Sequence, residues 1–180
     1  MTADPMVFLL KTLGNLYLFV VLLRLVLQLS RADFYNPITQ GIVKATNPLL
    51  LPLRKVVPSL GRVDMASIVL AFGVQLLTII LVLALSSYQA SPLQYAVFTV
   101  AGTLYHLLDL YFWAMLISVI LSWVAPGANH PGAMLVQQVT APLYDFCRKF
   151  IPNLGGLDIS PIFIFILLTM LKQVFAPYVI

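Results

Sequence analysis

Four stretches of the sequence are long and apolar enough to cross a lipid bilayer as helices. They cover residues 6–29, 65–85, about 100–123 and 161–179, and a spanning helix needs about 20 mostly apolar residues. Hydrophobic residues make up 61% of the chain and charged residues 9%, whereas a soluble domain is about half apolar and about a quarter charged. The surplus apolar surface has to face lipid. The sequence therefore predicts an all-α membrane protein with four transmembrane helices.

The basic residues indicate the orientation of these helices. The segments 30–63 and 124–157 contain most of the lysines and arginines, and the short segment 86–92 contains none. Because positive residues stay on the cytoplasmic side, we expect both long loops in the cytoplasm. Both termini and the short loop then face outward, and we expect a multi-pass protein of the inner (plasma) membrane.

The chain is an internal repeat. A shift of 94 residues aligns its halves without a gap, and ten of the 28 positions from 37 to 64 are identical to their counterparts, prolines, glycines and charged residues among them. Apolar composition alone would not produce such matches. We therefore predict two tandem repeats, 1–90 and 91–180. Each crosses the membrane twice, so the two are parallel, related by a pseudo-twofold axis along the membrane normal.

Each long loop is predicted to hold two short amphipathic helices. Asn36 or Asn129 would cap the first one, and Pro48 or Pro142 would separate it from the second. Further turn and cap residues repeat behind them. We expect prolines to end the second helix, glycines to form a tight turn and aspartates to cap the next membrane helix, at Pro58 and Pro152, Gly61 and Gly155, and Asp64 and Asp158.

Two basic pairs recur in these loops, Arg54-Lys55 and Arg148-Lys149. Amphipathic helices of this kind lie in the headgroup plane with their basic residues toward anionic lipid. The loops either only connect and orient the membrane helices, or they form a surface that docks lipid headgroups or a protein partner.

Polar residues inside the membrane form a second candidate site. His106 and Asp109 lie on one face of the third membrane helix, and Thr12 and Asn15 hold the corresponding positions of the first. They either form interhelical hydrogen bonds, or they handle a proton or cation with Asp109 as the partner of His106. Arg24, near the cytoplasmic end of its helix, is expected to snorkel to the surface.

Chemistry typical of enzymes is missing from the sequence. No phosphate-binding, dinucleotide-binding, zinc-protease or nucleophile-elbow motif occurs. The single cysteine, Cys147, excludes an internal disulfide and a cysteine-based zinc site. His106 and Asp109 alone are too few for a metal. We expect no enzymatic activity, no cofactor and no contact with nucleic acid.

The loop sequences resemble the YggT repeat, which is related to YlmG-type proteins. The resemblance rests on Phe34-Tyr35-Asn36-Pro37, the segment from Thr46 to Pro58, Gly61-Arg62-Val63-Asp64, Ser122-Trp123, Arg148-Lys149-Phe150-Ile151-Pro152 and Gly155-Gly156-Leu157-Asp158-Ile159-Ser160-Pro161. The first copy departs from this pattern, with Gln28-Leu29 in place of Ser-Trp and Ala66-Ser67 in place of Ser-Pro.

The resemblance implies a bacterial membrane protein with plastid relatives and no agreed catalytic residues. Relatives are linked to osmotic tolerance and potassium uptake, to cell division and envelope organisation, and to haem attachment and nucleoid distribution in plastids. Two functions follow as hypotheses. The first is a non-enzymatic scaffold or assembly factor, acting in envelope organisation or stress tolerance, with a membrane-protein partner or as a homo-oligomer. The second is transport of an ion, potassium or proton, or of an osmolyte by an oligomer.

Overall fold

The computed structural model describes residues 4–60, 63–86, 88–150 and 158–180. This part of the chain is helical and has no β-strand. The helices are α1 Pro5–Leu29, α2 Pro37–Val56, α3 Met65–Leu85, α4 Pro92–Val124, α5 Pro131–Arg148 and α6 Ser160–Phe175, which a 3₁₀ turn, η1 Ala176–Tyr178, extends. Four segments are long and apolar enough to cross a membrane: α1, α3, α4, and α6 with η1. The predicted all-α architecture with four spans is confirmed.

Most helices begin with a proline in the first turn and a polar residue before it. Asn36 caps α2, because its side chain accepts a hydrogen bond from the Ile38 amide at 2.9 Å, and Ser91 and Gln94 form a capping box at α4. The prediction that Asn129 caps α5 is wrong. His130 takes that position, and its Nδ1 accepts from the Gly132 amide at 3.2 Å. An imidazole nitrogen can satisfy a first-turn amide as a carboxamide oxygen does.

Each long loop contains one continuous helix, not two short ones. Pro48 lies inside the 20-residue α2 and Pro142 inside the 18-residue α5. An interior proline normally costs about 3 kcal/mol, because it removes a hydrogen bond and crowds the preceding turn. The threonine two positions before each proline donates to a carbonyl one turn back from itself: Thr46 to Ile42 at 2.8 Å, and Thr140 to Val136 at 2.8 Å. Pro58 follows the end of α2, as predicted.

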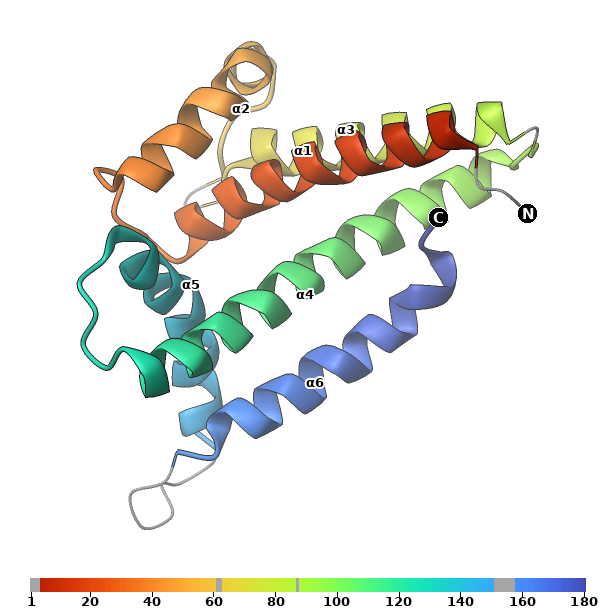
Figure 1. Cartoon of the computed structure of the whole chain (residues 1–180). Coiled ribbons are helices and arrows are strands. Elements are labelled where there is room, and N and C mark those ends of the chain that lie inside the picture. Colours follow the sequence, from red (N-terminus) through yellow and green to blue (C-terminus); the bar gives the residue numbers. More distant parts are fainter. Residues whose placement is uncertain (1–3, 61–62, 87, 151–157) are drawn as a thin grey trace.

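The four spanning segments lie side by side, and α2 and α5 lie at the end of α1 and α4 that is far from both termini (Figure 1). Within each half the three helices contact one another, α1 with α2 and α3, and α4 with α5 and α6. The halves meet through α3 and α4, through α1 with α4 and α5, and through α2 and α5. Both repeats therefore point the same way, with the loop helices α2 and α5 at the same end of the bundle.

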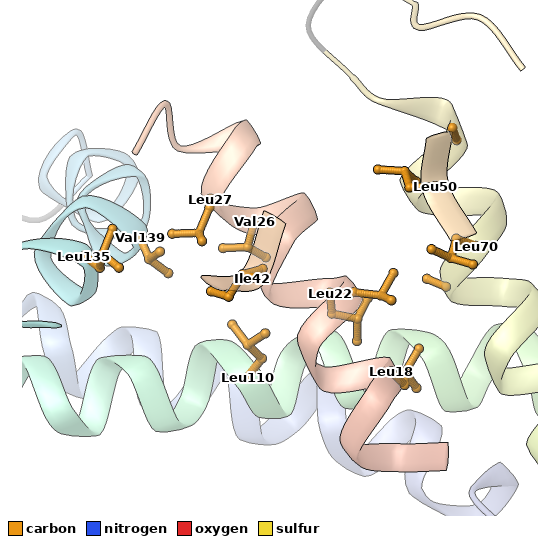
Figure 2. Packing of buried hydrophobic residues seen from close by; sticks show 13 residues of the cluster. Leu18, Leu22, Val26, Leu27, Ile42, Leu50, Leu70, Leu110, Leu135 and Val139 are labelled. Atoms are coloured by element: carbon orange, nitrogen blue, oxygen red, sulfur yellow. The ribbon is translucent and has the colours of Figure 1, made fainter. Parts of the chain in front are cut away.

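The main apolar cluster holds this end together. Leucines and valines of α1 meet α2 and α3 on one side and α4 and α5 on the other, and Figure 2 shows Leu18, Leu22, Val26, Leu27, Ile42, Leu50, Leu70, Leu110, Leu135 and Val139. A second cluster joins α4, α5 and α6 through Met115, Cys147, Ile164 and Leu168. Because lipid is as apolar as leucine, close van der Waals packing stabilises such contacts.

The twofold relation between the halves is only approximate. Under exact symmetry the contact of α3 with α4 would have a counterpart between α6 and α1. The structure has the first contact, but α1 and α6 do not touch in the described part of the chain. The side of α4 between α1 and α6 is consequently open.

Candidate functional site

An equivalent Arg–Asp ion pair joins the end of the loop helix, α2 or α5, to the start of the membrane helix that follows it, in both repeats. Arg54 at the end of α2 binds Asp64 ahead of α3 with its Nε at 3.2 Å and Nη2 at 2.5 Å. Arg148 of α5 binds Asp158 with its Nε at 3.3 Å and Nη2 at 2.7 Å. Both arginines were predicted to face lipid headgroups. Each places two guanidinium nitrogens on an aspartate, while Lys55 and Lys149 form no ion pair with any described residue. Their contact with headgroups stays a prediction.

The two aspartates act differently from the helix caps that were predicted. Asp64 stands at the N-cap position of α3, but its carboxylate accepts no backbone amide there and instead accepts the Ser67 hydroxyl at 2.8 Å. Asp158 does accept the Ser160 amide, at 2.9 Å, although the N-cap residue of α6 is Ile159. Asp158 thus accepts the Ser160 amide with Oδ1 and Arg148 with Oδ2, whereas Asp64 Oδ2 accepts both Arg54 and the Ser67 hydroxyl. Pro152, Gly61 and Gly155 lie outside the described residues.

These contacts set the charge of both carboxylates. Burial by itself would raise the pKa of Asp64, but hydrogen bonds from Arg54 and Ser67 outweigh burial and leave the pKa below its ordinary value. The pKa of Asp158 is lowered by hydrogen bonds from Ser160 and Arg148, and the same aspartate raises the pKa of Arg148. Both pairs are therefore ionised near neutral pH.

Arg24 does not snorkel to the surface. It is 8% exposed, and its Nη1 donates to the Val43 carbonyl at 3.1 Å, the Thr46 hydroxyl at 2.5 Å and the Asn47 side chain at 2.9 Å. These groups lie in the turn before Pro48, so the guanidinium ties α1 to α2. The second repeat keeps a weaker version of this contact, in which the Thr140 and Ser118 hydroxyl oxygens lie 3.4 Å apart.

Inside the membrane span, Asp109 of α4 pairs with Lys172 of α6 and not with His106. The Lys172 ammonium also lies over the Tyr105 and Phe112 rings, 5.2 and 4.8 Å from their centroids. His106 stacks edge-on against Tyr105, with the ring centroids 5.8 Å apart. Of the two interpretations left open for these residues, the pairing of His106 with Asp109 is not what the structure has, since the carboxylate binds Lys172 of another helix.

Three of the four polar residues predicted inside the membrane line one cavity of about 410 Å³ between α1 and α4. They are Asn15, His106 and Asp109, and Phe19 and Trp113 are among the apolar residues beside them. Thr12 does not join them, because its hydroxyl donates to the Phe8 carbonyl of its own helix at 2.8 Å. Neither Asn15 nor His106 hydrogen-bonds any described side chain or backbone group.

The cavity continues as an apolar groove toward the loop helices α2 and α5. This second hollow, about 250 Å³, lies between α1, α2, α4 and α5. It shares Phe19, Leu110, Trp113 and Ile117 with the polar cavity. We call the two together the α1–α4 groove. It lies on the face of α4 beside α1, while α6 holds Asp109 through Lys172.

The described residues form no cluster of three or more His, Cys, Asp or Glu side chains that could hold a metal. Cys147 is buried, and burial raises the pKa of its thiol. The chemistry that the site offers is hydrogen bonding and ion pairing at membrane depth, together with guanidinium groups at the end where α2 and α5 lie.

Sequence reasoning missed Lys172 and Arg24 as parts of these sites. The internal repeat could have indicated the role of Lys172. The 94-residue shift aligns Asn15 with Asp109 and Thr78 with Lys172, so both repeats have a polar residue at each of these two positions. In the first repeat Thr78 packs against Gly14, where a side chain would collide with it. No comparable signal marked Arg24, whose counterpart is Ser118.

Comparison with known proteins agrees with the repeat. The family profile CCB3/YggT matches the chain twice, over residues 3–85 and 97–179. An uncharacterised protein of Pseudomonas aeruginosa is 51% identical over 169 residues, 93% of this chain and 86% of that protein. An uncharacterised Vibrio alginolyticus protein is 42% identical over 166 residues, 91% of this chain and 89% of its own.

The uncharacterised protein YggT of Escherichia coli K12 is 34% identical over 173 residues, 94% of this chain and 88% of its own length. No solved structure matches the chain significantly. With both halves matched and relatives aligned along nearly their whole length, the chain belongs to the CCB3/YggT family of membrane proteins.

Proposed function

We propose that this protein is a non-enzymatic scaffold or assembly factor of the bacterial inner membrane that holds a transmembrane helix of another protein in the α1–α4 groove. The observation that carries the proposal is the groove itself, open along α4 and lined at membrane depth by Asn15, His106 and Asp109. Envelope organisation or stress tolerance is the setting that we propose for this role.

The energetics favour a protein occupant. Polar groups that face hydrocarbon are costly and tend to be turned toward other helices. Asn15 and His106 lie in the groove without a hydrogen-bond partner among the described residues. A partner helix with one polar side chain at that depth would satisfy them, at about 0.6–2 kcal/mol for each hydrogen bond. An acyl chain would satisfy none of them.

A second copy of this chain that docked through its α3 face would complement the groove less well. The exposed face of α3 is aliphatic, through Val69, Leu76, Leu77, Ile80 and Leu81. A copy that docked through this face would leave the polar side chains of the groove unpaired. We therefore commit to a different membrane protein, whose helix carries a hydrogen-bonding residue near its middle.

The test is site-specific photocrosslinking in living cells, with a photoreactive residue at Trp113 or Ile117 in the groove and at Leu77 or Ile166 on the outer faces of α3 and α6. We expect a discrete protein adduct from the groove positions alone, weakened by Asn15→Leu or His106→Leu. Adducts that form equally from the outer faces, that consist of lipid or a second copy of the chain, or that ignore both leucine variants would refute the proposal.

The orientation in the membrane is part of the proposal. The loop helices α2 and α5, with Lys55 and Lys149, would face the cytoplasm, as the distribution of basic residues favours. Cysteines placed at Lys55 and Lys149 in a Cys147→Ser background should both be shielded from a membrane-impermeant maleimide in intact cells. Both should react after permeabilisation. Labelling of either cysteine in intact cells would contradict this orientation.

One observation favours a second function, a pathway for an ion or osmolyte through an oligomer. The polar cavity of about 410 Å³ brings Asn15, His106 and Asp109 together. Against it stands the Lys172 ammonium, which already neutralises Asp109. Purified protein in liposomes would show potassium or proton flux that Asp109→Ala reduces if this function is right, and no flux above empty liposomes if it is wrong.

A further inference from the structure

A separate hollow at the end of α1 collects three arginines. It measures about 340 Å³ and lies between the C-terminal turn of α1 and the α2 helix. Arg24, Arg31 and Arg54 line it, together with Gln28 and Thr39. We call it the arginine pocket. It lies at the end of the helices where the chain leaves the predicted membrane span, which is the level of the lipid headgroups.

Arg31 holds an unusual backbone conformation at the rim of this pocket. Its φ of 53° lies in the left-handed region, which non-glycine residues rarely adopt. The hydrogen bonds Ala32 N–H to Leu27 at 2.9 Å and Arg31 N–H to Gln28 at 3.2 Å form a Schellman motif, whose left-handed residue is usually glycine. An arginine thus occupies the place where glycine folds most easily, and its side chain lines the pocket.

A buried hydroxyl in the wall has no partner. Thr39 is 6% exposed, and its Oγ1 makes no hydrogen bond in the described structure. A buried hydroxyl without a partner costs about 1–3 kcal/mol. Arg24 uses Nη1 for its contacts with α2, and its Nε and Nη2 donate to no described group. The pocket therefore offers donors that the protein itself leaves unused.

The arginine pocket also has more positive than negative charge. Asp64 pairs with Arg54, and the lining includes no carboxylate, so Arg24 and Arg31 are not compensated there. The corresponding hollow of the second repeat, about 610 Å³, has Ser118 and Ala125 in their places, and its Arg148 faces Asp158. Of these two hollows, as the described residues form them, that of the first repeat is the cationic one.

We propose that the arginine pocket binds a phosphate group, and that the headgroup of an anionic glycerophospholipid supplies it. Guanidinium groups bind phosphate oxygens through paired, charge-assisted hydrogen bonds, and the Thr39 hydroxyl would donate one more. The apolar groove lies on the other side of the Leu27 and Ile42 side chains, which line both hollows.

The test compares lipids on the purified, delipidated protein in detergent by native mass spectrometry, with phosphatidylglycerol as the anionic lipid and phosphatidylcholine as the neutral one. We expect the protein to prefer phosphatidylglycerol. Arg31→Gly should weaken this binding about tenfold, the loss of a hydrogen bond to a charged group, without lowering the melting temperature of the lipid-free protein, because glycine relieves the left-handed residue. Thr39→Val should also weaken binding and leave the lipid-free protein as stable as before.

Lys55→Ala is the matched control, since it removes an exposed positive charge next to Arg54 that does not line the pocket. Binding that falls equally in Lys55→Ala and Arg31→Gly would reduce the effect to general surface charge and overturn the proposal. So would unchanged binding in both pocket variants, or equal binding of phosphatidylcholine. A competition arm with millimolar inorganic phosphate separates the sources: displacement of the lipid by free phosphate would overturn the assignment to a lipid headgroup, and retention of the lipid would support it.

Discussion

Replacing Lys172 with methionine removes the cation that neutralises Asp109 inside the membrane span. The ammonium links α6 to α4, and it lies between the carboxylate and the Tyr105 and Phe112 rings. The Lys172 side chain is 18% exposed and that of Asp109 is 33% exposed. Methionine keeps most of the volume and the contact with the rings, so the variant isolates the charge.

The expected cost follows from the unpaired carboxylate. A charge near the centre of a membrane helix costs about 2.5–3.5 kcal/mol on insertion scales, and breaking a buried pair from one side costs about 3–5 kcal/mol. Because a third of the Asp109 side chain is exposed, we take a value toward the lower end, about 2–3 kcal/mol. The double variant Asp109→Asn/Lys172→Met leaves no charge behind and should lose only about 1 kcal/mol.

The assay is unfolding of the purified protein by SDS in mixed micelles, followed by circular dichroism, for both single variants and the double variant. A coupling free energy of at least about 1–2 kcal/mol is expected from this cycle, the loss for Lys172→Met less that for the double variant, and any loss for Asp109→Asn adds to it. Gln173→Met, at the exposed neighbouring position, serves as the control. The reasoning is refuted if Lys172→Met costs less than about 0.5 kcal/mol, or if the double variant loses the sum of the two single losses.

Three further predictions use the same unfolding assay. Gly14→Ala should lose about 1–3 kcal/mol of stability, because the added methyl overpacks against Thr78. Gly73→Ala is the control, since its added methyl meets no atom within 4 Å, and it should be neutral or gain up to about 1 kcal/mol. Equal effects of the two variants would contradict the contact between Gly14 and Thr78. Asp64→Asn should cost about 2–3 kcal/mol because Asp64 is 2% exposed, and Asp158→Asn under about 1 kcal/mol because Asp158 is 31% exposed; the reverse order would be inconsistent with the burial. Both aspartates have lowered pKa values, so the stability that they supply is complete above their unfolded-state pKa near 4 and is lost as the pH falls through the folded values. The wild type should therefore lose more stability between pH 5 and pH 3 than either Asn variant. Parallel curves of stability against pH would refute this linkage.

The repeat made much of this architecture predictable. A gapless match between the halves implies the same fold for both, and the shared motif residues marked the corners that Arg54–Asp64 and Arg148–Asp158 close. The roles of these residues were harder to predict. Proline predicts a helix break from local backbone geometry alone, but α2 and α5 continue through Pro48 and Pro142. In α2 the turn before Pro48 is also held by Arg24 of another helix, a contact that local geometry does not record.

The sequence by itself determined the number of spans, their parallel arrangement in two repeats and the polar residues at equal depth, because length, hydropathy and period are properties of the chain. Only the tertiary structure decided that Asp109 pairs with Lys172, that Arg24 is buried against α2, and that α1 and α6 stay apart along the face of α4. These are contacts between helices distant in sequence. They depend on how helices rotate and approach in three dimensions, which a pattern along one helix does not record.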